Sequence, residues 1–281
     1  MSKIALGTVQ FGLNYGIGNI EGRTNSVEVS KILDTAFSYG IRVVDTAQAY
    51  GDSEKVLGKL HDDRFQIITK INPSPKDTRS TKLIVQESLD KLNLECIHGL
   101  LFHSASSAIQ NPRIVREIRE LKRNGIVQKM GFSVYTPNEL RQLISKYGLP
   151  DLIQIPYSHL DRRFEQIATD LHQRGVEIHS RSAFLQGLFF LKDEEVPEFF
   201  KPIAHYLFEL KKNFSSSERL AQALLNYCLS KDFIDYVVIG INNEAQLIQN
   251  ISNLKITLDE LPEAPVNIVE SILMPNLWPK N

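Results

Sequence analysis

Eight short apolar runs recur along the chain and alternate with longer segments whose apolar residues follow helical spacing. Short runs rich in Val, Ile and Leu are typical of strands buried in a parallel sheet. The predicted strands cover residues 4–6, 41–44, 65–70, 97–103, 127–132, 152–155, 176–179 and 236–239. Strands that each lead into a helix favour an α/β fold, and eight of them predict a closed (β/α)8 TIM barrel with extended loops at its C-terminal face.

The segments between these runs carry helix start and stop signals. Asn25 and Thr136 are capping residues, Pro137 is a proline at a first helical position, and Gly40 ends a helix. Besides the helix that begins near Asn25, the predicted helices cover residues 53–60, 81–92, 113–123, 137–147, 164–174, 203–212, 217–230, 243–251 and 266–273. An open doubly wound sheet is the alternative, and it is disfavoured because no G-x-G-x-x-G motif follows the first strand.

The length of 281 residues suits one barrel, since such barrels typically have roughly 250 residues, and we expect one domain over residues 1–281. The net charge of −1 gives no global positive field for nucleic acid or an anionic membrane. No apolar run is long enough to span a bilayer, and the N-terminus does not resemble a signal sequence. We therefore expect a cytoplasmic protein with small-molecule partners. Cys96 and Cys228 lack the spacing of a metal site, and no metal is predicted.

Four polar side chains stand at the predicted carboxyl ends of three successive strands. Asp45 and Tyr50 follow the second strand, Lys70 ends the third and His103 ends the fourth. In a parallel barrel these ends meet at the catalytic face. Each residue alone has an ordinary structural explanation, such as a helix cap or a solvated strand end. Four such residues on adjacent strand ends favour a site.

This combination suits proton donation to a carbonyl oxygen. A nearby ammonium lowers the pKa of a tyrosine, and a carboxylate holds that ammonium protonated and in place. Asp45, Lys70 and Tyr50 are therefore predicted to form a chain of charge-assisted contacts that ends at a hydroxyl able to protonate a developing alkoxide. His103 is expected to donate a hydrogen bond to the same oxygen.

Asp-Thr-Ala at 45–47, Tyr-Gly at 50–51, a lysine ending the third strand and a histidine ending the fourth resemble the aldo/keto reductase family. The resemblance extends from residues 7–12 to residues 240–250. It implies a carbonyl reductase that uses NADP(H) or NAD(H), in which Tyr50 is the general acid, Lys70 and Asp45 support it, and His103 orients the substrate carbonyl.

The resemblance also implies a set of residues that bind the cofactor. Ser133 and Gln154 match residues that hold the nicotinamide carboxamide, but Val134 stands where the family usually has asparagine. Arg181 matches a position against the nicotinamide ring. The remaining implied contacts are Gly7, Thr8 and Asp45, then Ser182, Phe184 and Gly187 around the pyrophosphate, and Gly240, Asn242, Gln246, Gln249 and Asn250 around the adenosine.

The adenosine positions bear on the choice between NADP and NAD. Gly240, Asn242 and Gln246 stand where many family members have basic residues that pair with the 2′-phosphate. Neutral side chains cannot make the charge-assisted bidentate contact that arginine makes with phosphate. NAD, or weak discrimination, is therefore predicted, and a lysine or arginine from elsewhere in the fold is the alternative.

The substrate pocket is expected from residues 11–15, the loops at 157–163 and 180–201, and the C-terminal tail. His159, Arg162 and Arg163 in these loops would suit a sugar-related or acidic substrate. Two other functions stay open. One is a Schiff-base barrel lyase that uses Lys70, and the other is a nucleotide-binding sensor without efficient turnover.

Overall fold

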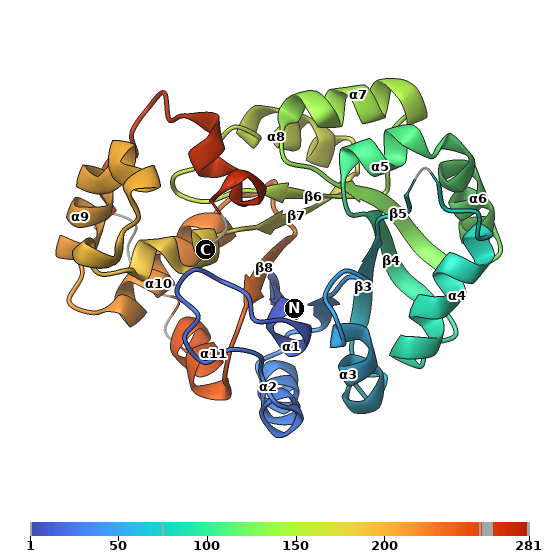
Figure 1. Cartoon of the computed structure of the whole chain (residues 1–281), viewed down its shortest axis with the longest axis horizontal. Helices are drawn as coiled ribbons and strands as arrows, with labels where there is room; N and C mark the ends of the chain where they lie inside the picture. The colour runs from blue at the N-terminus through green and yellow to red at the C-terminus, as the bar shows by residue number, and fades with distance from the viewer. Residues whose placement is uncertain (1, 75, 253, 255–260, 280–281) are drawn as a thin grey trace.

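The computed structural model describes residues 2–74, 76–252, 254 and 261–279. Its strands form a closed barrel in the order of the sequence, and every neighbouring pair is parallel (Figure 1). The barrel closes where Ile4 of the first strand lies opposite Val237 of the last. The strands are β1 (Ile4–Gly7), β2 (Val43–Asp45), β3 (Gln66–Ile71), β4 (Ile97–Phe102), β5 (Val127–Ser133), β6 (Leu152–Pro156), β7 (Glu177–Arg181) and β8 (Tyr236–Gly240).

Helices surround the barrel on its outside (Figure 1). They are α1 (Val9–Gly12), α2 (Ser26–Ser38), α3 (Ser53–Leu60), α4 (Thr81–Leu92), α5 (Ala105–Gln110), α6 (Pro112–Arg123), α7 (Pro137–Tyr147), α8 (Glu165–Gln173), α9 (Ala204–Lys212), α10 (Ser217–Leu229) and α11 (Glu244–Ile251). The predicted (β/α)8 barrel is confirmed. Helix α7 shows why the boundaries were readable, because Thr136 and Glu139 form a capping box and Pro137 occupies the first turn.

The interior of the barrel changes from apolar to polar along the strands. Ile68 of β3 and Leu152 of β6 belong to a small apolar cluster inside the barrel. Two residues further along the same strands stand Lys70 and Gln154, both almost fully buried. Because side chains two residues apart lie on the same face of a strand, the polar pair sits directly above the apolar layer. The polar site therefore lies on a layer of closely packed apolar side chains.

Four segments differ from the sequence predictions. Residues 7–12, where no helix was predicted, contain the single turn α1, and α5 follows β4, where none was predicted either. The loop at 180–201 contains short 3-10 turns at Leu185–Phe190, Asp193–Glu195 and Glu198–Ile203. The predicted helix at 266–273 is wrong, since only Glu270–Leu273 forms a 3-10 turn. Val266 is 75% exposed and Asn267 has a left-handed φ of 59°, so the first half of this segment is not helical, although Ile272 and Leu273 at its end are buried.

The predicted domain extends over residues 1–281, and residues 1, 75, 253, 255–260 and 280–281 lie outside the described residues. Within the described ranges, none of the helices combines the length and apolar character that crossing a membrane requires. Cys228 is buried, whereas Cys96 is half-buried and accepts a weak contact from Gln128.

Candidate active site

A buried ion pair joins the ends of β2 and β3. Lys70 Nζ donates hydrogen bonds to Asp45 Oδ1 at 2.5 Å and to the Thr46 carbonyl at 2.8 Å. Asp45 Oδ2 accepts a second hydrogen bond from Gln154 Nε2 at 2.7 Å. Burial lowers the pKa of Lys70, and the Asp45 carboxylate opposes that shift. Both carboxylate oxygens are thus satisfied, as a buried charge requires.

Tyr50 lies between this ion pair and His103. Lys70 Nζ is 5.1 Å from the centroid of the Tyr50 ring, and the His103 ring meets the Tyr50 ring edge-on with centroids 5.6 Å apart. The structure therefore brings together the four residues that the sequence placed at three strand ends.

The electrostatics of Tyr50 differ from the sequence expectation. Burial raises the pKa of Tyr50 above its ordinary value, and the Asp45 carboxylate raises it further. The cation that lowers this pKa is the Arg181 guanidinium, whereas the sequence argument assigned that role to Lys70. The reason is geometric, because Lys70 is already bound to Asp45 and lies over the ring face of Tyr50.

His103 is kept neutral by its surroundings. Its backbone N–H donates to the carbonyl of Ile71, which fixes it at the end of β4 next to β3. Burial, followed by the positive charges of Lys70 and Arg181, lowers the pKa of His103 to about 3. At neutral pH the imidazole is therefore uncharged and carries one N–H donor and one acceptor.

The loop that carries Tyr50 is held by buried hydroxyls and by a glycine. Ser53 Oγ lies within 2.8 Å of Thr8 Oγ1 and 3.0 Å of Thr46 Oγ1, which joins the loops after β1 and β2. A Cβ on Gly12 would lie 1.7 Å from the Tyr50 carbonyl, so only glycine allows this approach. The sequence indicates only a helix start at Ser53. Its role had no sequence signal, because it depends on contacts across the fold.

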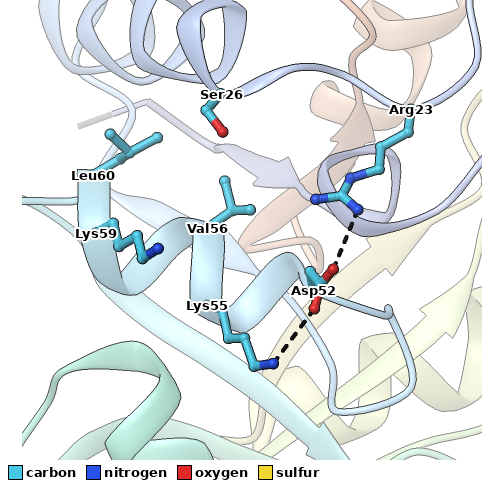
Figure 2. Close-up of a pocket in the computed structure, with 7 residues that line it drawn as sticks. All are labelled: Arg23, Ser26, Asp52, Lys55, Val56, Lys59 and Leu60. Atoms are coloured by element: carbon cyan, nitrogen blue, oxygen red, sulfur yellow. Dashed lines mark hydrogen bonds and ion pairs between the residues drawn. The ribbon is translucent and has the colours of Figure 1, made fainter.

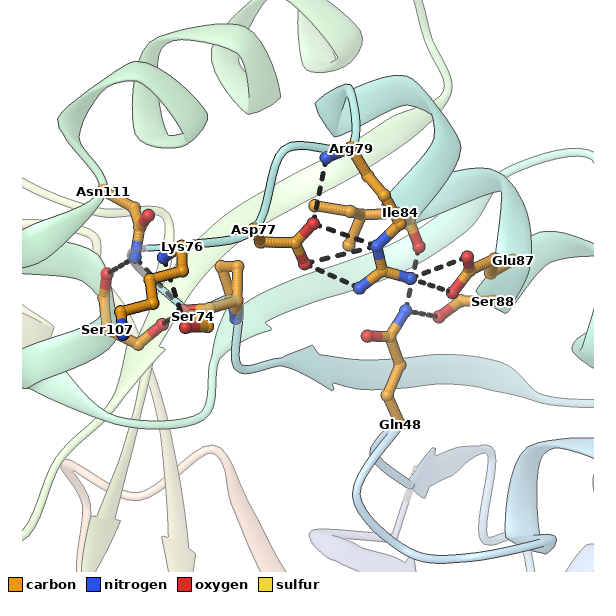
Figure 3. Close-up of polar contacts among 11 residues, drawn as sticks. Gln48, Ser74, Lys76, Asp77, Arg79, Ile84, Glu87, Ser88, Ser107 and Asn111 are labelled. Carbon is orange, nitrogen blue, oxygen red and sulfur yellow. Dashed lines mark hydrogen bonds and ion pairs between the residues drawn. The ribbon is translucent and has the colours of Figure 1, made fainter.

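A second attachment runs through Gln48. Its side-chain amide donates to the Ile84 carbonyl at 2.8 Å and to Ser88 Oγ at 2.9 Å, both on α4 (Figure 3). In the same region Arg79 bridges Asp77 and Glu87. The Tyr50 loop is therefore tied to the helix behind it as well as to the loop after β1.

The ends of β5, β6 and β7 complete the mouth of the barrel. Ser133 lies opposite Gln154 in the β5–β6 register. Arg181 at the end of β7 donates from Nη2 to the Val134 carbonyl at 3.1 Å, and its guanidinium lies 4.2 Å from the centroid of the Tyr135 ring. Tyr135 was not predicted as a site residue, although it follows the end of β5 by two residues.

Two loops meet beside this mouth. The Ile17 amide donates to the Gln186 carbonyl at 3.0 Å, so the loop after β1 contacts the loop after β7. Gln186 and Gly187 have left-handed φ values of 54° and 92°, which shape this turn. A separate surface hollow lies outside the barrel along α3, where Arg23 and Lys55 flank Asp52 (Figure 2). It includes none of the strand-end residues.

Comparison with known proteins identifies the chain. The model of the aldo/keto reductase family matches residues 3–271. The chain belongs to this family. It is therefore an oxidoreductase that reduces small carbonyl compounds with NADPH or NADH.

Individual relatives are distant but extend over much of the chain. The uncharacterized oxidoreductase YqkF of Bacillus subtilis is 25% identical over 277 residues, which cover 89% of this chain and 90% of the relative. The NADH-specific methylglyoxal reductase of Escherichia coli is 27% identical over 228 residues, 67% of this chain and 69% of that protein. An aldo-keto reductase of Bacillus halodurans, solved in its holo form, superposes with a TM-score of 0.73 at 21% identity, covering 92% of this chain and 91% of that chain.

The strand ends of this aldo/keto reductase fit a nicotinamide cofactor. Within the described residues, the Ser133 hydroxyl and the Gln154 amide oxygen have no hydrogen-bond partner in the protein. A hydroxyl beside an amide oxygen can bind both the carbonyl and the amino group of a carboxamide. Val134, which replaces the family's asparagine, contributes its backbone carbonyl to Arg181. Ser133, Gln154 and Arg181 stay predicted cofactor contacts.

The predicted adenosine end lies around α11. Asn250 is 5% exposed, and within the described residues its side-chain amide has no hydrogen-bond partner, which suits a base with both donors and acceptors. Gln246 Oε1 accepts from the Asn242 amide at 2.8 Å. The Gln249 carbonyl accepts a hydrogen bond from Gln222. Gln246 is thus already engaged with the backbone of its own segment.

Proposed function

We propose that Tyr50 is the general acid of this reductase and that His103 orients the substrate carbonyl. The observation that carries this proposal is the position of the Tyr50 ring between Lys70 Nζ and the His103 ring at the mouth of the barrel. The phenol is the group there that can give up a proton, because His103 is neutral and Lys70 is engaged with Asp45.

Each residue of the site has its own role in the proposed reaction. Bound NADH or NADPH supplies a hydride for the carbonyl carbon. Tyr50 is protonated at neutral pH and gives the proton of its hydroxyl to the carbonyl oxygen as negative charge develops there. The N–H of neutral His103 donates a hydrogen bond to the same oxygen. Arg181 is the cation that stabilises the phenolate that results, whereas Lys70 stays paired with Asp45.

The alternatives lose support for structural reasons. A Schiff-base lysine must be accessible and neutral, whereas the Lys70 side chain is fully buried and paired with Asp45. A sensor without turnover would not need the convergence of Tyr50 and His103. The sugar-related substrate was inferred from His159, Arg162 and Arg163. Two of these side chains are engaged within the protein, since His159 binds Tyr206, and Arg163 binds Asp161 and Glu270. It stays a prediction, as do a cytoplasmic location and a lack of nucleic-acid partners.

We infer that the enzyme prefers NADH to NADPH. Basic residues are missing at Gly240, Asn242 and Gln246. The related Escherichia coli enzyme is named as NADH-specific, which agrees with that expectation. We propose an NADH-dependent reductase of small aldehydes or ketones.

The test compares Tyr50→Phe with Tyr39→Phe, which removes an equivalent hydroxyl from an exposed residue at the end of α2. We expect the first change to lower kcat for methylglyoxal and simple aldehydes at least about 100-fold, since general acid catalysis contributes 10²–10⁴-fold. NADH affinity, measured by calorimetry, should stay the same in both variants. A Tyr50→Phe enzyme with wild-type kcat would refute the general-acid assignment. A wild-type protein that binds NADH but reduces none of these carbonyls would favour the sensor.

A further inference from the structure

The segment that leads into α11 faces a group of carboxylates from the other end of the chain. Helices α2 and α11 lie side by side (Figure 1). Glu28, in the first turn of α2, accepts a hydrogen bond on Oε1 from the Glu244 amide at 2.7 Å. Glu21, in the loop before α2, accepts with both carboxylate oxygens from Asn243 Nδ2 at 3.1 Å. The N-terminal loop thus brings two negative charges to the start of α11.

The amide groups that would attract an external anion are already engaged. The first N–H groups of a helix normally favour a phosphate or carboxylate. Here Glu28 occupies the Glu244 amide, Asn243 Oδ1 binds the Gln246 amide at 2.8 Å, and Gln246 Oε1 binds the Asn242 amide. The hydrogen bond from the Glu244 amide also lowers the pKa of Glu28, so this carboxylate is ionised at neutral pH. The protein's own carboxylate therefore fills the anion position of α11.

The charge balance around this segment is negative. Glu21, Glu28 and Glu244 contribute three carboxylates, and Glu244 Oε1 accepts a neutral hydrogen bond from Thr35. Among the described residues, the cation paired with this group is Lys31, 3.4 Å from Glu28 and 54% exposed. A lone exposed lysine offsets one charge of three. A further dianionic phosphate placed here would meet like charge.

We propose that Glu21 and Glu28 are specificity-determining residues that reject the 2′-phosphate of NADP(H) and so make this enzyme select NAD(H). The proposal rests on the proposed function, because it takes the segment from β8 to α11 as the site of the adenosine ribose. This repulsion is a second cause of selectivity, in addition to the absence of basic residues at Gly240, Asn242 and Gln246. Neutral residues alone give weak discrimination, whereas fixed carboxylates repel the phosphate and give active exclusion.

The experiment measures the dissociation constants of NADH and NADPH by calorimetry at low and at moderate salt. The test variant is Glu21→Gln/Glu28→Gln, because glutamine keeps an oxygen that accepts the Asn243 and Glu244 hydrogen bonds and removes only the charge. Glu21→Gln alone changes an exposed loop residue and gives a second reading if the double variant folds poorly. The matched control is Glu120→Gln on α6, an exposed carboxylate paired only weakly with Arg123.

We expect wild type to bind NADH at least about tenfold more tightly than NADPH at low salt, with the ratio shrinking as salt screens the repulsion. In the double variant the ratio should fall by at least about fivefold and lose most of its salt dependence, because two of the three carboxylates lose their charge. Glu120→Gln should behave as wild type. An unchanged ratio in both Gln variants would overturn the inference while leaving the proposed function in place. Equal wild-type affinities would overturn the inference and the proposed preference for NADH, while leaving the proposed roles of Tyr50 and His103 in place. A wild type that binds neither nucleotide would overturn the cofactor site itself.

Discussion

Asp45→Asn tests how much the buried ion pair contributes to the fold that holds the site. The Lys70 side chain is fully buried and that of Asp45 is 4% exposed, so solvent screens their interaction little. The substitution keeps the size of the side chain and removes its charge. It leaves the Lys70 ammonium with a neutral amide and the Thr46 carbonyl as its partners.

Two losses contribute to the expected magnitude. Removing one partner of a buried ion pair costs about 3–5 kcal/mol. Asp45 also accepts from both Lys70 and Gln154, whereas asparagine has one acceptor oxygen, so a buried donor loses its partner. We expect the free energy of unfolding to fall by about 4 kcal/mol at pH 7. For a domain of this size that corresponds to a decrease in Tm of about 10 °C.

The loss should depend on pH with a defined sign. Burial lowers the pKa of Lys70, and the carboxylate that opposes this shift is gone in the variant. A lysine whose folded pKa is lowered costs nothing above its unfolded pKa of about 10.4, and the cost grows as the pH falls toward the folded pKa. The difference between variant and wild type should therefore be larger at pH 7 than at pH 10.

Urea unfolding of wild type, Asp45→Asn, Lys70→Met and the double variant gives the coupling energy between the two residues. The double variant should recover at least about 2 kcal/mol relative to the sum of the single losses, because it no longer contains an unpaired buried charge. Asp34→Asn, at an exposed carboxylate, is the control. Additive losses, or a single Asp45→Asn loss that is the same at pH 7 and pH 10, would refute the reasoning.

Three further predictions concern neighbouring groups. Because the pKa of His103 is lowered to about 3, its imidazole signal in NMR should not titrate between pH 5 and 8. The stability that neutral His103 contributes should be lost as the pH falls from about 6.5 toward 3. An NMR titration midpoint above pH 6 would contradict this prediction. Gly12→Ala should lower kcat at least about tenfold with the barrel intact by circular dichroism, because the new methyl group displaces the Tyr50 loop; unchanged kcat would show that the loop is not held there. Burial raises the pKa of Glu54, so its charged form costs stability as the pH rises. Glu54→Gln should therefore raise Tm at pH 8 but not at pH 4. Equal changes in Tm at both pH values would argue against a buried charged Glu54.

The barrel and its four strand-end residues were predictable because both depend on local patterns. Short apolar runs end at Asp45, Lys70 and His103, and a parallel barrel brings successive strand ends together whatever the loops do. The sequence therefore determined which side chains meet. Tyr50 was readable for the same reason, since it follows a strand end by five residues.

Features that depend on contacts between distant segments were not predictable. Arg181 acts on Tyr50 across the barrel from β7, and no spacing in the sequence records that approach. Glu28 lies in the first turn of α2, and its contact with the Glu244 amide spans 216 residues. The helix predicted at 266–273 failed because its apolar spacing was not accompanied by burial of Val266.

Around Tyr50, the residues that fix the structure of the site differ from the group that is proposed to donate the proton. Asp45 accepts with both oxygens and so does not compete for the Tyr50 proton. Lys70 has three N–H donors, and two of them bind Asp45 and the Thr46 carbonyl. Within the described residues the third has no partner, although Lys70 lies over the Tyr50 ring. In the proposed mechanism, Arg181 stabilises the phenolate that forms when Tyr50 gives up its proton, and Lys70 holds Asp45 in place without binding the phenol beforehand.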